Sequence, residues 1–348
     1  MTDSRPAAIH EEAKLPAGGL ITGGKGYARD NGAGQSYNYY GGGVYVEAGA
    51  SFVLAGDTIY ACGVQSGAFQ AFGGGIYADG GSVTMTGGAI RNCVVSADYG
   101  AGGGGIYLKD ANDTYPSFTM TGGVIAGCSA NSGGGIYAAP GTVRITGGSI
   151  ENCTATKRGG GLSVSGYADQ ISVLNAAISD CKAKRGGDVA LIGFAELELG
   201  ENTRITGCTA SEKDDDEEGA IECGAAIYMD LEETYTVNYP GCFLYANGGR
   251  VEGTVYVGRN GSNQDAEIKA TNAIDHTDGK PTTVFTGDVY CEGDIRGGSF
   301  YGSVTAAIPN NYLDWDITKT FGATSPAAAF TAPSARRAMS PAAHSMTG

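Results

Sequence analysis

Several features are scarce or missing in this sequence, and each absence excludes a class of protein. No apolar run reaches the roughly 18 residues that a membrane-spanning helix needs, so we expect no insertion into a membrane. No window shows a sustained helical period, which argues against helical domains. Lys and Arg number 22 against 37 Asp and Glu, for a formal net charge of −15. We therefore expect no nucleic-acid partner, because such binding depends on clustered cations.

Metal-binding signals are also sparse. The sequence has three histidines and no Cys-x-x-Cys motif, which disfavours a zinc site. One acidic run offers carboxylate oxygens but lacks the alternating spacing and the glycine turn of a calcium loop. We predict a solvated loop there, with calcium as the weaker alternative, and we expect no cofactor. The run contains Asp214, Asp215, Asp216 and Glu217.

Glycine is abundant instead, with 60 residues in a chain of 348. Many of the glycines open a recurring hexapeptide, and the distance from one copy to the next ranges from 26 to 38 residues. Repeats of this length indicate a solenoid, a propeller or another array. The copies are GGGVYV at 41, GGGIYA at 73, GGGIYL at 103, GGGIYA at 133, GGGLSV at 159, GGDVAL at 186 and GAAIYM at 224.

Each repeat contains three short runs rich in β-branched residues, separated by glycine-rich corners. Three strands in about 30 residues make one turn of a parallel β-helix, in which each strand pairs with its equivalents in neighbouring coils. The sequence therefore predicts an all-β fold, namely a right-handed, single-stranded parallel β-helix (a pectin-lyase-like solenoid) with about 7–10 coils and capping ends. The expected divisions are a flexible N-terminal tail over 1–17, a capping first coil over 18–40, regular repeats over 41–248, irregular coils or a C-terminal cap over 249–321, and a disordered tail over 322–348.

Six of the nine cysteines close an Ile-x-x-Cys unit, one in each repeat. The same phase in successive coils stacks them about 4.8 Å apart with parallel side chains, which is poor geometry for a disulfide. We therefore predict a column of reduced thiols in the core. Cys223, Cys242 and Cys291 fall outside the pattern and receive no assignment. The column consists of Cys62, Cys93, Cys128, Cys153, Cys181 and Cys208.

Tyrosine follows the core isoleucine in the first strand of several repeats, so strand alternation directs it outward. We expect a ladder of Tyr45, Tyr77, Tyr107 and Tyr137, interrupted at Ser163 and Ala190 and resumed at Tyr228. Stacked rings would stabilise adjacent strands. The same four rings could instead form a flat aromatic strip that binds a glycan or a partner protein, and they are the binding-site candidate of the sequence.

The combination of a Gly-Gly-x-Ile opening with an Ile-x-x-Cys closure resembles the GGAI and FxxN repeats of polymorphic membrane proteins and the related repeats of bacterial surface adhesins. The resemblance covers about 41–230. Ile stands where that family has Phe, and Cys lies near the position of its Asn. The resemblance implies a β-helix that works at the cell surface or as a secreted protein. We identify no signal peptide and no anchor motif in the chain.

These observations favour a non-catalytic, elongated scaffold, which would be an extracellular or cell-surface adhesin or display protein that is monomeric and binds host or environmental glycans or a surface protein. One alternative is a phage virion protein, such as a tail spike or fibre, which would be a homotrimer. A second alternative is a polysaccharide lyase or glycoside hydrolase, which would need paired carboxylates or a base with cationic groups. Asp180 and Asp188 flank one corner and could approach each other, but corner aspartates usually form turns. We expect no enzymatic activity.

Overall fold

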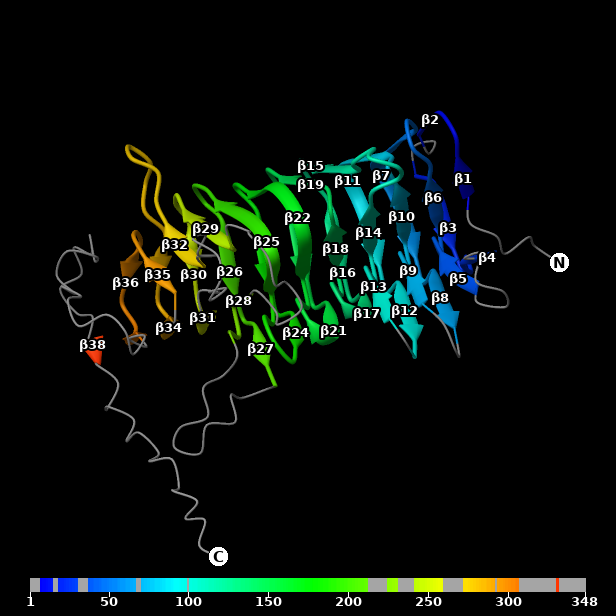
Figure 1. The fold of residues 1–348 in the computed structure, drawn as a ribbon. Coiled ribbons are helices and arrows are strands. Elements are labelled where there is room, and N and C mark those ends of the chain that lie inside the picture. The colour runs from blue at the N-terminus through cyan, green and yellow to red at the C-terminus, as the bar shows by residue number, and fades with distance from the viewer. Residues whose placement is uncertain are drawn as a thin grey trace, which may run out of the picture.

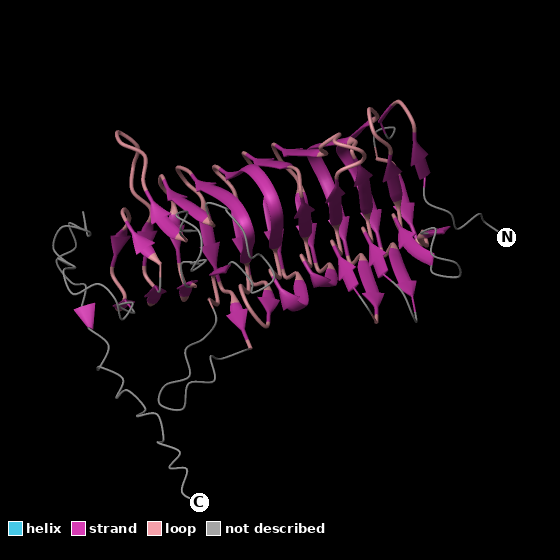
Figure 2. Ribbon diagram, in the orientation of Figure 1, coloured by secondary structure: helices cyan, strands magenta, loops and turns pink. Residues whose placement is uncertain are grey.

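The computed structural model describes residues 7–14, 18–30, 37–66, 70–98, 100–211, 224–230, 241–258, 272–291, 293–306 and 330–331. This part of the chain consists of β-strands, turns and loops (Figure 2) and includes no helix that could span a membrane. The strands lie side by side along one axis, coil after coil, from β1 to β36 (Figure 1). The prediction of an all-β parallel β-helix is confirmed.

Three parallel ladders of strands form the solenoid. The first ladder contains β1 (Ala7–Ile9), β6 (Val44–Val46), β10 (Ile76–Asp79), β14 (Ile106–Lys109), β18 (Ile136–Ala139), the start of β22 (Leu162–Val173), the start of β25 (Val189–Leu199), β28 (Ile227–Asp230), β31 (Val255–Val257), β34 (Val289–Cys291), β37 (Val304–Ala306) and β38 (Phe330–Thr331). The second contains β2 (Glu12–Lys14), the start of β7 (Ser51–Tyr60), the start of β11 (Ser82–Arg91), β15 (Ser117–Met120), β19 (Thr142–Ile145), the ends of β22 and β25, β29 (Phe243–Ala246), β32 (Ala273–Asp275) and β35 (Asp294–Ile295). The third contains β3 (Leu20–Thr22), the ends of β7 and β11, β16 (Val124–Ala126), β20 (Ser149–Glu151), β23 (Ala177–Ser179), β26 (Arg204–Thr206), β30 (Arg250–Val251), β33 (Val284–Phe285) and β36 (Ser299–Phe300).

Ten successive coils contribute a strand to every ladder, and β37 begins another coil. The first coil is built from β1, β2 and β3, which pair with β6 and β7. The prediction of a flexible tail over 1–17 is therefore wrong for the residues of β1 and β2, because their backbone groups extend the ladders of the next coil. The predicted tail over 322–348 lies outside the described residues, apart from β38.

The core is a set of apolar columns that run the length of the solenoid. In the third ladder the isoleucine of each repeat lies directly above its equivalent in the coil before, as in the register of Ile90, Ile125 and Ile150. These side chains are completely buried. Each contributes about 1.5–3 kcal/mol relative to an exposed position. Because the columns are continuous, every coil is stabilised by contacts with its neighbours.

A second, ten-stranded sheet projects from one edge of the solenoid and lies along its lower side in Figure 1. It contains β4 (Tyr27–Asp30), β5 (Tyr37–Tyr40), β8 (Gly63–Ser66), β9 (Gln70–Phe72), β12 (Val94–Ala97), β13 (Gly100–Gly102), β17 (Ser129–Ser132), β21 (Thr154–Arg158), β24 (Lys182–Ala183) and β27 (Thr209–Ala210). Its small apolar core consists of Val64, Ala71, Val95, Ala97, Ala101 and Ala130. The sequence predicted three strands in each repeat, and it did not predict this additional sheet.

At Gly135, the third glycine of its hexapeptide, the corner where the edge sheet joins the solenoid leaves no room for a side chain. A Cβ atom at Gly135 would lie 2.5 Å from the carbonyl oxygen of Gly161 and 2.8 Å from Cγ2 of Ile150. It would also lie 3.4 Å from Sγ of Cys153. The repeat therefore combines glycine with cysteine at this corner, because the thiol occupies the space that the missing side chain leaves.

Candidate functional site

The predicted tyrosine ladder forms on the first strands of the coils. Tyr45, Tyr77, Tyr107 and Tyr137 are in register, and the ring centroids of successive residues are 5.3, 5.5 and 5.1 Å apart. A second stack continues beyond the interruption from Tyr228 to two further tyrosines, Tyr256 and Tyr290. The rings thus stabilise neighbouring strands over much of the solenoid.

The interpretation of this ladder as an exposed binding strip is wrong for its two central members. Tyr77 is 2% exposed and Tyr107 is 7% exposed, while Tyr45 and Tyr137 are half-buried. The edge sheet covers the central rings, with Tyr40 4.7 Å from Tyr77 and Phe72 4.6 Å from Tyr107 between centroids. Burial also raises the pKa of Tyr77 and of Tyr107.

An arginine reaches the point where the tyrosine ladder resumes. Ser163 and Ala190 are buried and carry no ring, and Tyr228 follows in the next coil. Arg185, two residues after the end of β24, donates a hydrogen bond to the hydroxyl of Tyr228 at 3.3 Å. Its guanidinium carbon lies 5.6 Å from the centre of that ring, which is a cation–π contact. Tyr228 in turn donates to Asp230 at 2.6 Å.

The six cysteines of the repeat lie in one column at the corner after the third strand. All are free thiols; Cys62, Cys93, Cys128, Cys153 and Cys181 are buried, and Cys208 is partly exposed. Each thiol donates to a backbone carbonyl, for example Cys153 to Glu151 at 3.4 Å and Cys208 to Glu252 at 3.4 Å. The thiols next to Cys128, followed by burial, raise its pKa well above the usual value. This arrangement is structural, since five of the six thiols are buried in the core and out of reach of a substrate.

Asp188 takes the place of the third glycine in one repeat. It lies buried in the core, whereas we expected a corner aspartate to form a turn. Asp180 does occupy a turn, with a φ of +55°. Asp188 is fully buried beside Cys181, whose backbone N–H donates to its Oδ1 at 3.2 Å. Its Oδ2 has no hydrogen-bond partner in the described structure. Burial raises the pKa of Asp188 to about 8, so the side chain is predominantly neutral at pH 7.

The structure describes some of the remaining cysteines, whereas the other cysteine and the predicted calcium ligands lie outside the described residues. Cys242 is buried, and burial raises its pKa to about 12. Cys291 is buried in β34 in register with Val257. Cys223 and the calcium candidates Asp214, Asp215, Asp216 and Glu217 lie outside the described residues. Within the described ranges, no three His, Cys, Asp or Glu side chains are placed to hold a metal ion.

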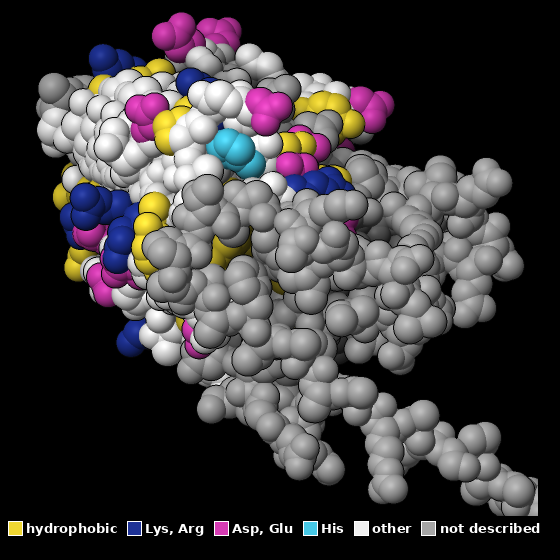
Figure 3. Space-filling view, turned by 90° about the vertical axis from the view of Figure 1, so that its left-hand side faces the viewer, with side chains coloured by type: hydrophobic (Ala, Val, Ile, Leu, Met, Phe, Trp, Pro, Cys, Tyr) yellow, Lys and Arg dark blue, Asp and Glu magenta, His cyan; other side chains and the backbone are white. Residues whose placement is uncertain are grey.

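A different surface combines aromatic and charged side chains, on the outer side of the second ladder near the C-terminal end. We call it the Tyr245 face and define it by Glu196, Glu198, Phe243, Tyr245, Asp275, Asp294 and Arg296. Strand register places Glu196 beside Phe243, and places Tyr245 between Glu198 and Asp275. In Figure 3, which views this end of the molecule, acidic, basic and apolar side chains lie next to one another.

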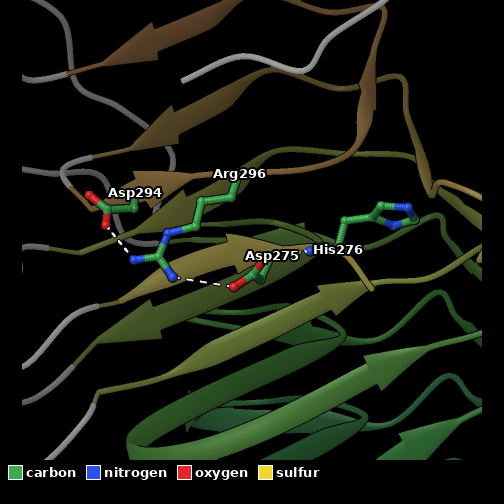
Figure 4. Close-up of polar contacts among 4 residues, drawn as sticks. All are labelled: Asp275, His276, Asp294 and Arg296. Carbon is green, nitrogen blue, oxygen red and sulfur yellow. Dashed lines mark hydrogen bonds and ion pairs between the residues drawn. The ribbon is translucent and has the colours of Figure 1, made fainter. Parts of the chain in front are cut away.

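Arg296 connects the two aspartates of the Tyr245 face. Its guanidinium donates to Asp294 at 2.7 Å and to Asp275 at 3.2 Å. Asp275 also accepts the backbone N–H of His276 at 2.7 Å. Figure 4 shows Arg296 between the two carboxylates, with the imidazole of His276 directed away from them. The carboxylates therefore have fixed positions while the arginine side chain remains 44% exposed.

A second hydrogen-bond network holds the opposite side of this face. The side-chain amide of Asn247, which is almost fully buried, donates to Glu198 at 3.0 Å and to the hydroxyl of Thr277 at 3.0 Å. The backbone N–H of Thr277 donates back to Asn247 at 2.8 Å. Glu198 is thus oriented by a side chain of the neighbouring coil rather than free to rotate.

The charges of the Tyr245 face also act on its tyrosine. Burial, followed by the nearby Glu196 and Asp275, raises the pKa of Tyr245, and Arg296 opposes this shift. Phe243 and Tyr245 are both partly exposed, with ring centroids 6.2 Å apart. Glu198 and Asp275 lie two strand spacings apart, about 9.6 Å along the ladder. Chemically, this face can stack on a ligand and accept hydrogen bonds from it.

Comparisons with protein-family models, curated proteins and solved structures give no match to this chain. The geometry of its own residues therefore carries the functional argument. Sequence reasoning missed the Tyr245 face because three of its four strands, β29, β32 and β35, lie beyond the last hexapeptide at 224. The available signal was the alternation of Phe243, Leu244, Tyr245 and Ala246, which directs two aromatic side chains outward.

Proposed function

We propose that this chain is a non-catalytic, elongated scaffold that works outside the cell or at its surface as an adhesin or display protein. The observation that carries the proposal is the unbroken stacking of ten coils over one apolar core. Such a solenoid gains length by adding coils that contact only their neighbours, and it presents long, flat faces to solvent. Five of the six column thiols are buried in the core, which fits a structural role.

The proposal predicts a monomer in solution that binds glycans without cleaving them. Light scattering should give a mass of 35.3 kDa, and a glycan array on the same sample should show binding. Chromatography of the bound glycans after long incubation should recover them at their original length. A stable trimer would contradict the proposal in favour of a virion fibre or spike, and shortened glycans would contradict it in favour of a polysaccharide-degrading enzyme.

A further inference from the structure

We infer that the Tyr245 face is a binding site for a saccharide that carries positively charged amino groups. The inference rests on the proposed function and specifies its ligand. It follows from three features that meet on this face: partly exposed aromatic rings, an excess of carboxylates, and hydrogen bonds that fix those carboxylates before any ligand arrives.

The aromatic pair supplies a surface for sugar rings and for their ammonium groups. Phe243 and Tyr245 project from the same side of β29, two residues apart, and both rings reach solvent. Aromatic residues with one apolar and one polar end are effective at such wet interfaces, because the ring packs against the ligand while the hydroxyl remains hydrated. A ring face also attracts an ammonium group within about 6 Å.

The charge of the face selects the class of saccharide. Three carboxylates, on Glu198, Asp275 and Asp294, stand against the single guanidinium of Arg296, which leaves a formal charge of −2 on these four side chains. A uronate or sulfated glycan would be repelled, whereas protonated amino groups would be attracted. Sites that bind acidic polysaccharides need an excess of cationic groups, whereas this face has an excess of carboxylates.

The polar groups are pre-organised, which reduces the entropy lost on binding. Glu198 is fixed by Asn247 from the adjacent coil, and Asp275 by Arg296 and by the backbone N–H of His276. Each carboxylate retains lone pairs for a ligand after these bonds are made, because an ionised carboxylate accepts about four hydrogen bonds. Hydroxyl and ammonium groups of an aminosugar are donors of the required kind.

Calorimetric titration of the full chain with four probes tests the inference. The probes are a glucosamine oligomer, an N-acetylglucosamine oligomer of equal length, a galacturonic acid oligomer and spermine. We expect the glucosamine oligomer to bind most tightly and its affinity to fall as salt is added, because the charges are exposed to solvent. The galacturonic acid oligomer should not bind.

Three variants locate the site. Tyr245→Ala should weaken binding of the glucosamine oligomer about tenfold through loss of ring contact. Glu198→Gln, which keeps the shape of the side chain, should weaken it about threefold at low salt and less at high salt. The matched control is Tyr115→Ala, which removes a 61% exposed tyrosine far along the chain and should leave the affinity unchanged. Equal thermal unfolding of the variants shows that each is folded.

The outcomes separate this inference from the proposed function. Equal affinity for the acetylated oligomer would overturn the role of charge, and equally tight binding of spermine would overturn the requirement for a saccharide. A monomer that binds other glycans on the array but none of these probes would overturn the inference while the scaffold proposal stands. Cleavage of the glucosamine oligomer would overturn the non-catalytic function while binding at this face stands.

Discussion

At the scale of single residues, Asp188 is the position where this chain departs most sharply from its own repeat. Five earlier repeats have glycine here, and in four of them a Cβ would lie close to a column thiol, as at Gly161 and Cys181. The aspartate instead places a carboxyl group among apolar side chains with one oxygen unpartnered. A buried charge without a counterion is costly, so the group is neutral in the folded protein below its raised pKa.

This burial makes stability depend on pH in the direction opposite to that of a paired carboxylate. The unfolded chain ionises Asp188 near pH 4, whereas the folded chain keeps the proton up to about pH 8. Between those values the folded state binds more protons, so stability falls as pH rises, by at most about 1.4 kcal/mol per pH unit. Asp188→Asn should remove this slope: denaturant unfolding should find it similar to the parent near pH 4 and more stable near pH 8.

The control for this prediction is Asp113→Asn, which removes a carboxylate from an exposed turn. The free energy of unfolding of this variant should change with pH in the same way as that of the parent. If the free energy of unfolding had the same slope against pH in the parent and in Asp188→Asn, Asp188 would titrate as it does in water. That result would contradict the burial argument.

At the scale of elements, the cysteine column predicts a graded pattern of thiol reactivity. Alkylation requires both access and thiolate. Cys208 is the partly exposed member of the column, while Cys128 and Cys153 are completely buried. Under native conditions iodoacetamide should therefore label Cys208 first, and Cys128 and Cys153 only when coils open. Peptide mass spectrometry after timed labelling measures this order. Equal rates in native protein would mean that the corner of the solenoid opens readily.

The edge sheet shows why strand alternation predicted the tyrosine ladder but not its burial. Alternation along Gly75, Ile76 and Tyr77 correctly directs the ring away from the main core. What it cannot convey is that Phe72, just before the glycine turn, folds back across the ring of Tyr107. An aromatic residue directly before the glycine run was the only local sign. The contact depends on the path of the chain between coils, which the repeat does not specify.

The Tyr245 face also could not be predicted from the repeat pattern. Its residues come from β25, β29, β32 and β35, and the distance along the chain between successive members varies from coil to coil. Periodicity therefore could not align Tyr245 with Asp275. Core positions were predictable because every coil repeats one apolar pattern. Surface positions were not, because each coil carries its own outward residues on the same backbone ladder.

At the scale of the whole molecule, stability should be distributed along the solenoid rather than concentrated in one nucleus. Each coil pairs only with the coil before and the coil after it, so the free energy is approximately a sum of coil and interface contributions. Ile150 lies in β20, in the middle of the stack, and Ile295 lies in β35, in the last complete coil. Both side chains are buried, which makes them a matched pair.

Replacing each of these two isoleucines by alanine should have different consequences, although both substitutions remove the same side-chain carbons. Ile150→Ala should destabilise both neighbouring interfaces, costing about 2–5 kcal/mol, and should speed hydrogen exchange in β16, β20 and β23. Ile295→Ala should speed exchange only in β32 to β37, because the end coil can open without breaking the rest. Exchange that rises equally throughout the described strands in both variants would show instead that the solenoid unfolds as one cooperative block.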